Sequence, residues 1–213
     1  MTLDLAGIRQ EYGRLGLAPA DCHSDPLVQL QQWLQAAVAA GVNEPTAMNL
    51  ATVDERGRPS ARIVLLKGLD QGQLNFFTNY HSRKGECLAH NPWAALTLFW
   101  PELERQVRIE GHVSELDTAL SDAYFASRPY GSRIGAWASE QSQPLTDPDA
   151  LAARAEALQA QYPQQVPRPA HWGGYGLAPD RIEFWQGRPS RLHDRVLYLP
   201  DDHGGWTRSR LQP

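Results

Sequence analysis

Cysteine is scarce in this chain, and long hydrophobic runs are absent. Cys22 and Cys87 are the only cysteines among 213 residues, and they show neither the spacing of a zinc site nor that of a redox motif. We therefore expect free thiols in a reducing compartment. Residues 1–13 lack the apolar core of a signal peptide, and no apolar run approaches the length of a membrane span. The sequence predicts a soluble, cytoplasmic protein that contacts no membrane.

Excess positive charge is missing as well. The chain has 20 basic and 24 acidic residues, and its formal net charge of -4 argues against a broad surface for nucleic acid. It contains no strand-borne G-x-G-x-x-G, no G-x-x-x-x-G-K-[ST], no G-x-S-x-G and no H-E-x-x-H. No motif therefore supports a Rossmann, P-loop, hydrolase or zincin site. The seven histidines are scattered without ligand spacing, so we expect no metal.

The sequence does contain a series of short apolar, β-branched runs separated by turn residues. They predict one domain over residues 1–213, mainly β with peripheral helices (α+β), built as a barrel or sandwich. Residues 48–79 are expected to form a meander of three antiparallel strands. Further strands are expected at 93–100, 105–116, 181–187, 195–200 and 205–211, and helices at 26–40, 82–91, 117–127 and 147–162.

Basic side chains stand at the ends of two of these predicted elements. Arg62 and Lys67 bracket the apolar residues 63–66, which we expect to be covered on both faces of a strand. End charges that simply meet water are the alternative there. Arg83 and Lys84 fall in the first turn of a helix, where the macrodipole disfavours cations but a bound phosphate would be stabilised. A surface helix with imperfect charge placement explains them equally well.

A third group combines hydroxyl and basic side chains. Tyr124 and Arg128 are four residues apart on a predicted helix and share a face, and Ser132 follows just beyond the break at Pro129. All three side chains can donate to phosphate oxygens, and arginine can do so with two parallel hydrogen bonds. The alternative is a helix C-terminus that a cation caps favourably.

The fourth group is the stretch "RLHDR". In an extended strand Arg191, His193 and Arg195 point to one side, and Asp194 points to the other. An exposed strand edge protected by its charges is the alternative. Taken together, the four groups offer more phosphate-binding side chains than one phosphate requires. Two phosphorylated ligands, or one large one, would account for them.

These segments carry a family resemblance. The strings "RIVLLKG", "FFTNYHSRK", "LERQVRIEG", "SRPYGSRIGAWASEQS", "HWGGY", "IEFWQG" and "RLHDR" occur in this order. In them the chain resembles the pyridoxine (pyridoxamine) 5'-phosphate oxidase family of flavoproteins, from about residue 8 to residue 213. The resemblance implies an FMN-binding split β-barrel and a homodimer with FMN at the subunit interface. It also implies a partly mobile N-terminal segment, 1–25, and C-terminal strands, 181–213, that complete the site.

The resemblance further implies which residues bind which ligand. The FMN contacts that it implies are Arg62, Ile63, Val64, Leu65, Leu66, Lys67, Phe77, Thr78, Arg83, Lys84, Gln106, Gln141, Ser142, Trp185 and Arg195. The substrate contacts that it implies are Lys67, Tyr124, Arg128, Ser132, Arg191 and His193, with Arg9 and Tyr12 of the N-terminal segment. One of the two expected phosphates then belongs to FMN and the other to the substrate.

The implied reaction is the oxidation of pyridoxamine 5'-phosphate or pyridoxine 5'-phosphate to pyridoxal 5'-phosphate. Oxygen is the electron acceptor, hydrogen peroxide is released, and the amine also yields ammonia. Arg191 and His193 are the expected catalytic residues, placed at the reacting end of the substrate. Two alternatives remain at this point: a flavin oxidase of the same fold that acts on another compound, as in phenazine biosynthesis, and a non-catalytic carrier of flavin or B6 vitamers.

Overall fold

The computed structural model describes residues 12–13 and 16–213. They form two compact units, one from the described residues up to 49 together with 96–110 and 180–213, and the other from residues 50–95 and 111–179. A nine-stranded sheet has the hydrogen-bonded order β2-β1-β5-β6-β7-β4-β3, and β8 pairs with both β7 and β9. Its strands are β1 (Ala47–Val53), β2 (Pro59–Leu65), β3 (Gly68–Asp70), β4 (Gln73–Asn79), β5 (Trp93–Trp100), β6 (Arg105–Glu115), β7 (Trp172–Gln186), β8 (Asp194–Pro200) and β9 (Trp206–Leu211). The mainly β fold with helical additions is therefore confirmed.

The first unit contains helix α1 (Pro26–Ala39). Asp25 caps this helix by accepting a hydrogen bond from the Leu27 N–H at 2.8 Å, and Pro26 occupies the first helical position. The Trp33 ring packs edge-on against Phe184 of β7, with centroids 5.1 Å apart. The short 3-10 helices η1 (Pro19–Asp21), η2 (Pro101–Leu103) and η3 (Pro189–Arg191) also belong to this unit.

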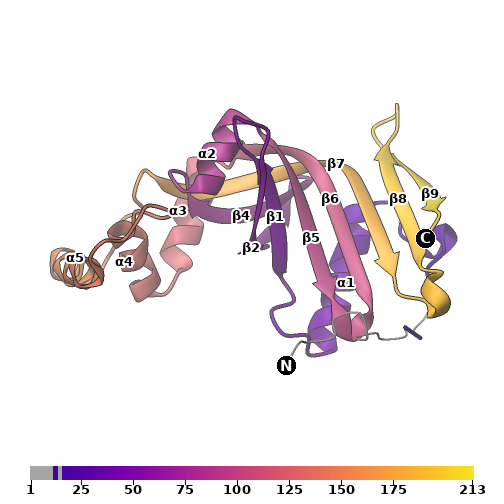
Figure 1. The fold of residues 1–213 in the computed structure, drawn as a ribbon, viewed down its shortest axis with the longest axis horizontal. Coiled ribbons are helices and arrows are strands. Elements are labelled where there is room, and N and C mark those ends of the chain that lie inside the picture. The colour runs from indigo at the N-terminus through magenta and orange to yellow at the C-terminus, as the bar shows by residue number, and fades with distance from the viewer. Residues whose placement is uncertain (1–11, 14–15) are drawn as a thin grey trace, which may run out of the picture. The chain divides into compact units, whose positions relative to one another are not determined.

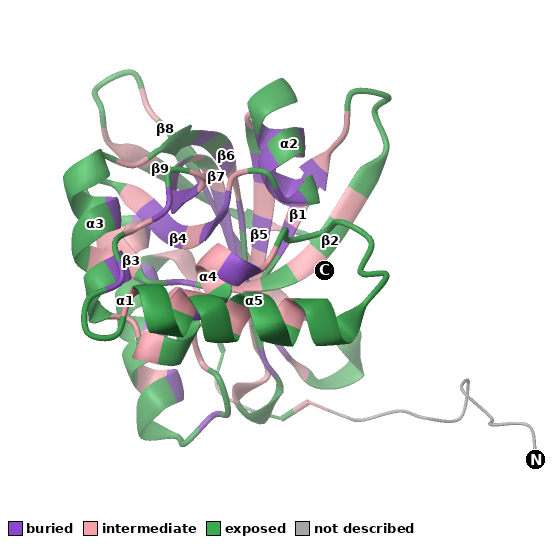
Figure 2. Ribbon diagram, turned by 90° about the vertical axis from the view of Figure 1, so that its left-hand side faces the viewer, coloured by how far each residue is buried: buried purple, intermediate pink, exposed green. Residues whose placement is uncertain are grey.

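The second unit carries four helices: α2 (Arg83–His90), α3 (Thr118–Ser127), α4 (Tyr130–Ala138) and α5 (Pro148–Gln161). Ser82 begins α2 as its N-cap, because its hydroxyl accepts from the Gly85 N–H at 3.4 Å. Helices α4 and α5 lie side by side (Figure 1). Figure 2 shows α5 as a mostly exposed helix, and none of its residues is buried.

The expected three-stranded meander is wrong in its third strand. The chain leaves β2 at Leu65 and forms a separate hairpin of β3 and β4, in which Gly68 pairs with Asn75. Strand β4 then pairs antiparallel with β7, so that Phe77 lies opposite Gly174. The hydrophobic pattern of residues 73–79 identifies a strand but carries no information about which strand will be its neighbour.

Two expectations about apolar residues are also wrong. Ile63 of β2 is 64% exposed, so this strand is not covered on both faces within one chain. Val38, which the helical spacing of the apolar residues in 26–40 predicts to lie on the core-facing side of α1, is 62% exposed, and Ala37 is buried instead. Both errors arise because the hydrophobicity of a residue does not by itself decide whether it is buried. A large apolar residue can face solvent in a single chain, and a buried position can be filled by a small side chain.

Helix α4 is an element that sequence reasoning missed. Pro129 follows the end of α3 as expected, but a new helix begins at Tyr130. Ser132 lies in the first turn of this helix, and its N–H donates a hydrogen bond to the Pro129 carbonyl at 2.9 Å. From the sequence, Pro129 predicts only the end of a helix. Yet a proline just before a helix presets the backbone angle for the first turn and lacks the N–H that such a position leaves unpaired.

Candidate active site

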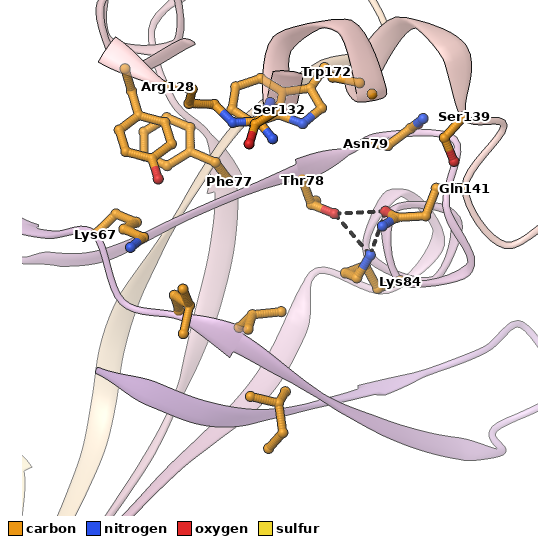
Figure 3. Close-up of a pocket in the computed structure, with 16 residues that line it drawn as sticks. Lys67, Phe77, Thr78, Asn79, Lys84, Arg128, Ser132, Ser139, Gln141 and Trp172 are labelled. Atoms are coloured by element: carbon orange, nitrogen blue, oxygen red, sulfur yellow. Dashed lines mark hydrogen bonds between the residues drawn. The ribbon is translucent and has the colours of Figure 1, made fainter. Parts of the chain in front are cut away.

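The second unit contains a cavity of about 490 Å³. Strands β2 and β4, helices α2, α3 and α4 and the start of β7 contribute to its wall. The residues that line it are Ile63, Val64, Leu65, Lys67, Phe77, Thr78, Asn79, Lys84, Tyr124, Arg128, Ser132, Gly135, Ala136, Ser139, Gln141 and Trp172. Segments separated by more than a hundred residues in sequence thus meet around one space (Figure 3).

Lys84 occupies one part of this cavity. Its Nζ donates to Thr78 Oγ1 at 2.8 Å, to Ser82 Oγ at 3.0 Å and to Gln141 Oε1 at 2.9 Å. Figure 3 shows Thr78, Lys84 and Gln141 meeting at this point. All three acceptors are neutral, and no ion pair joins Lys84 to a carboxylate among the described residues. Burial, and secondarily the charge of Arg62, lower the pKa of Lys84 to about 8.

Arg62 provides a second cation in the same unit. Its Nη1 donates to the Leu50 carbonyl at 3.0 Å and to Thr52 Oγ1 at 2.8 Å, and its Nη2 donates to Ser60 Oγ at 2.5 Å. Burial lowers its pKa, Cys87 acts in the opposite sense, and Arg83 adds to the lowering. Arg62 and Lys84 are therefore two partly buried cations held by neutral groups. Such groups are stabilised by an anion placed between or beside them.

The other part of the cavity holds the hydroxyl and guanidinium group. The Tyr124 ring stacks on Phe77 with centroids 3.8 Å apart and planes inclined by 16°. The Arg128 guanidinium lies over Trp172, and its buried Nη1 has no hydrogen-bond partner among the described residues. Burial lowers the pKa of Arg128 and raises that of Tyr124. Ser132 and Lys67 line the same space. An unpaired buried N–H of a cation is a site for an anionic oxygen.

Not every implied FMN contact in this unit lines the cavity. Leu66 is buried in the core, and Arg83 lines a separate cavity with Glu86 and His90. Ser142 is exposed beside Gln141 and has a positive φ of 76°. Sequence reasoning in turn missed Trp172, which stands in the quoted string "HWGGY" and lines the cavity. An aromatic residue directly before two glycines was the available signal.

The first unit holds a cluster of rings. Trp185 of β7 and His193 lie with centroids 4.6 Å apart, and Tyr12 packs against both at 5.6 and 5.7 Å. His193 Nδ1 accepts the Arg188 N–H at 3.2 Å, and burial followed by the charge of Arg191 lowers the pKa of His193. Gln106 lies half-buried on β6 of the same unit, and Arg9 lies outside the described residues.

The expectation that Arg191, His193 and Arg195 share one face of a strand is wrong. Arg191 ends the turn η3 with φ at 60°, and β8 begins only at Asp194. Pro189 starts this turn, and the Leu192 N–H closes it on the Pro189 carbonyl at 3.1 Å. The turn breaks the alternation on which the expectation depended.

Arg195 is held by the strand next to it. Its Nε and Nη2 donate to the two oxygens of Glu183, both at 2.9 Å, and its Nη1 donates to the Gln212 carbonyl at 2.8 Å. Glu183 is buried, and its hydrogen bond raises the pKa of Arg195. The negative group that faces Arg195 within the chain is therefore a carboxylate. An FMN contact through Arg195 stays a prediction.

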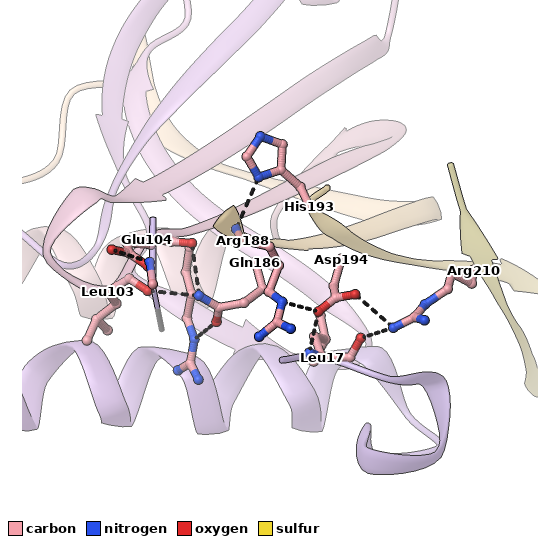
Figure 4. A network of polar contacts seen from close by, with 10 residues as sticks. Leu17, Leu103, Glu104, Gln186, Arg188, His193, Asp194 and Arg210 are labelled. Atoms are coloured by element: carbon pink, nitrogen blue, oxygen red, sulfur yellow. Dashed lines mark hydrogen bonds and ion pairs between the residues drawn. The ribbon is translucent and has the colours of Figure 1, made fainter. Parts of the chain in front are cut away.

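Asp194 links the end of the turn that begins at Pro189 to Leu17 and to Arg210 of β9 (Figure 4). Its Oδ2 accepts the Leu17 N–H at 3.0 Å and lies 3.5 Å from Arg188 Nε, while its Oδ1 lies 2.8 Å from Arg210 Nη2. Arg210 Nη2 also donates to the Leu17 carbonyl at 2.9 Å. Asp194 thus joins three segments of the chain and has a structural role.

Two further expectations concern membranes and metals. No helix among the described residues is long and apolar enough to cross a membrane. In the same part of the chain, no group of three or more histidine, cysteine and acidic side chains is placed to hold a metal ion.

Comparisons with known proteins give consistent results. Residues 34–162 match the family model "Pyridoxamine 5'-phosphate oxidase", and residues 172–213 match "Pyridoxine 5'-phosphate oxidase C-terminal dimerisation region". A pyridoxine/pyridoxamine 5'-phosphate oxidase of Chromobacterium violaceum is 61% identical over 100% of both chains. One of Neisseria gonorrhoeae is 58% identical over 99% of this chain and 100% of its own.

Solved structures extend the comparison to the fold. PhzG from Burkholderia lata 383, in complex with tetrahydrophenazine-1-carboxylic acid, superposes with a TM-score of 0.87 at 36% identity, covering 92% of this chain and 98% of that one. A pyridoxamine 5'-phosphate oxidase-related, FMN-binding protein from Nostoc punctiforme gives a TM-score of 0.71 at 20% identity, over 93% of this chain and 100% of that one. The second likeness bears on the fold alone.

Proposed function

The chain belongs to the pyridoxamine 5'-phosphate oxidase family, and on that premise we propose how its own residues carry out the family's reaction. The reaction is the FMN-dependent oxidation of pyridoxamine 5'-phosphate and pyridoxine 5'-phosphate to pyridoxal 5'-phosphate, with oxygen as electron acceptor. The chain includes the family's C-terminal dimerisation region and acts as a homodimer. We further propose a cytoplasmic location, which its two buried free thiols support.

One observation carries the assignment of the site. A single cavity brings together two cations that have no carboxylate partner among the described residues, Lys84 and Arg128, each with hydroxyl groups nearby. The donors around Lys84 fit the phosphate of FMN, because a buried ammonium without a carboxylate is suited to a dianion. Thr78 and Gln141 would complete this first set, and Arg62, which does not line the cavity, would add its charge.

The second set would hold the substrate. Arg128 Nη1 is buried without a hydrogen-bond partner in the described part of the chain, and Tyr124, Ser132 and Lys67 line the same space. A phosphate bound there would fix the orientation of the substrate. The reacting group would then be held in the geometry that the reaction needs. A substrate without phosphate would leave these donors unpaired. The set therefore favours a vitamin B6 phosphate over a compound of the phenazine type.

FMN, when bound, supplies the redox chemistry, because it takes two electrons from the substrate and passes them to oxygen. In the overall reaction the CH–NH2 group of the amine loses two hydrogens, water supplies the aldehyde oxygen, ammonia leaves, and oxygen becomes hydrogen peroxide. The alcohol loses two hydrogens and becomes the aldehyde directly. The protein's contribution is to bind and orient both reactants and to place hydrogen-bond donors around the reacting end.

We assign Arg191 and His193 to that reacting end. Because His193 Nδ1 accepts the Arg188 N–H, the neutral imidazole carries its proton on Nε2 and presents a donor there. Burial and the charge of Arg191 lower its pKa, which favours the neutral ring. His193 is thus set up to donate a hydrogen bond to the substrate. Tyr12, Trp185, Gln106 and Arg195 keep the roles that the family resemblance implies for them.

The test is a direct assay of the purified protein. A visible absorbance spectrum should show bound flavin, and pyridoxamine 5'-phosphate in air should give pyridoxal 5'-phosphate, ammonia and peroxide in equal amounts. A flavin-loaded protein that turns over a phenazine precursor but not the vitamer would support the first alternative. Tight vitamer binding with no product would support a carrier.

A further inference from the structure

Trp172 is a cavity residue to which the proposed reaction assigns no part. It is 6% exposed, and its indole ring lies on the wall of the cavity beside Arg128 (Figure 3). The guanidinium carbon of Arg128 is 4.5 Å from the centroid of this ring and 5.5 Å from that of Phe125. At these distances a cation is attracted to the electron-rich face of an aromatic ring, most strongly to tryptophan.

The kind of partner matters for what Arg128 can still do. A carboxylate partner would accept hydrogen bonds along the edge of the guanidinium, where a phosphate also binds. An aromatic partner contacts the flat face instead and leaves the edge donors free. Arg128 shows this arrangement, because its Nη1 is buried without a hydrogen-bond partner among the described residues.

Trp172 is itself held in place. The Arg168 guanidinium bridges helix α3 and the start of β7, since its Nε lies 2.5 Å from Asp122 Oδ1 and its Nη1 donates to the Trp172 carbonyl at 2.6 Å. The Trp172 N–H donates to the Pro169 carbonyl at 3.1 Å, and Trp172 pairs with Asn79 in the sheet. The indole therefore provides a fixed surface for Arg128.

We propose that Trp172 is a positioning residue that holds the Arg128 guanidinium face-on, with its edge donors open for the phosphate of the substrate. Through Arg128 it sets the preference of the site for phosphorylated over non-phosphorylated B6 vitamers. This inference rests on the proposed function, and it assigns to Trp172 a role that neither composition nor motif spacing indicates. The bridge from Asp122 through Arg168 supports that role.

The experiment compares Trp172→Leu and Trp172→Phe with the wild-type holoenzyme. Val166→Ala is the matched control, because Val166 is buried in the same cluster as Trp172 and does not line the cavity. The readouts are KM and kcat for pyridoxamine 5'-phosphate, and the equilibrium dissociation constants of pyridoxal 5'-phosphate and pyridoxal. Flavin content and melting temperature are recorded for each protein.

Trp172→Leu should raise KM and the dissociation constant of pyridoxal 5'-phosphate about threefold to thirtyfold, with kcat nearly unchanged. Pyridoxal binding should stay within about twofold of wild type, so the phosphate preference falls. Trp172→Phe should recover most of the loss, since it keeps an aromatic face. Val166→Ala should lower the melting temperature without changing the preference.

A double-mutant cycle with Arg128→Ala separates positioning from packing. In the Arg128→Ala background Trp172→Leu should have no further effect on pyridoxal 5'-phosphate binding, because the guanidinium it acts through is gone. An unchanged preference in Trp172→Leu, or a loss that persists in that background, overturns the inference. If Trp172→Leu is insoluble, Trp172→Phe decides, with at least about a twofold loss expected. A wild-type protein that oxidises neither vitamer would instead refute the proposed function.

Discussion

At the scale of single residues, the proposed site is built around two cations that have no carboxylate partner among the described residues. Lys84 and Arg128 are both partly desolvated; Lys84 donates to neutral acceptors, and the buried Nη1 of Arg128 has no hydrogen-bond partner in that part of the chain. Leaving a buried cation in this state costs stability in the isolated chain. In the proposed function, the phosphates of FMN and of the substrate would offset that cost.

Lys84 gives this argument a pH dependence. Its pKa of about 8 in the folded chain lies below the ordinary value of 10.5, because burial disfavours the charged form and Arg62 adds to the effect. A bound phosphate dianion favours the ammonium and raises that pKa, so FMN binding retains a proton that the free protein loses above pH 8. FMN affinity should therefore fall by up to about tenfold per pH unit above pH 8.

Fluorescence titration of the apoprotein with FMN between pH 7 and pH 10 measures this slope. Lys84→Arg keeps its charge over the whole range and should flatten the profile, even if its affinity is lower. The same steep fall in Lys84→Arg would assign the dependence to another group. The pH dependence of folding has the opposite sign to that of FMN affinity. The free energy of unfolding of the apoprotein should increase as pH rises from 8 to 10.5, because in this range only the unfolded chain still binds a proton at Lys84.

A substitution of Arg191 tests whether substrate turnover and flavin binding depend on different residues. Arg191→Met removes a charge at the proposed reacting end and leaves every residue of the proposed FMN phosphate set unchanged, so flavin content should stay normal. The loss of a charge-assisted hydrogen bond should reduce kcat/KM about tenfold to a hundredfold. Steady-state kinetics and the flavin absorbance of the same preparation measure both effects. Lost flavin with normal turnover on resupply would contradict this division.

At the scale of secondary-structure elements, the turn at residues 188–193 shows what periodicity misses. Alternating basic residues predicted one extended strand, whereas Ser190 and Arg191 both have positive φ and form a tight turn. Their conformation depends on contacts made far away in sequence, chiefly those of Asp194 with Leu17 and Arg210. A local pattern cannot contain that information.

Asp194 allows a test of this explanation. Asp194→Ala removes the acceptor for the Leu17 N–H and the partner of Arg210, and should lower the free energy of unfolding by about 1–3 kcal/mol. Asp194→Asn keeps an acceptor oxygen and should lose less. Urea unfolding of both variants measures the difference. Equal stability of the two variants and the wild type would show that the junction does not hold the turn.

Helices were more predictable than strand partners. Asp25 and Ser82 begin α1 and α2 as N-caps, because capping depends on a few neighbouring residues. Strand β4 was recognised, but its pairing with β7, across about a hundred residues, was not. Likewise, Tyr124, Arg128 and Ser132 were correctly expected to line one pocket, while Trp172 was missed because its contact with Arg128 spans 44 positions of the sequence.

At the scale of the whole molecule, the chain is half of the working unit. The C-terminal residues 172–213 match the dimerisation region of the family, and Ile63, an implied FMN contact, is 64% exposed in the single chain. An exposed apolar side chain next to a cofactor site is explained when a second subunit covers it. A second subunit over Ile63 would provide the cover that the apolar run 63–66 predicted and that the single chain does not supply.

Dimerisation and flavin binding should therefore be linked. Analytical ultracentrifugation should give about twice the chain mass of 23.8 kDa. On dilution, FMN should be released over the same concentration range in which the dimer dissociates, because a ligand bound at an interface stabilises the associated state. A stable monomer that retains full flavin would contradict the placement of FMN at the interface.

The most direct test of the central claim is a single turnover without oxygen. One equivalent of pyridoxamine 5'-phosphate, added anaerobically to the flavin-loaded protein, should bleach the flavin absorbance and form one pyridoxal 5'-phosphate per flavin. Admitting oxygen should restore the absorbance and release one equivalent of hydrogen peroxide. If the vitamer binds and the flavin stays oxidised, the protein is not a pyridoxamine 5'-phosphate oxidase.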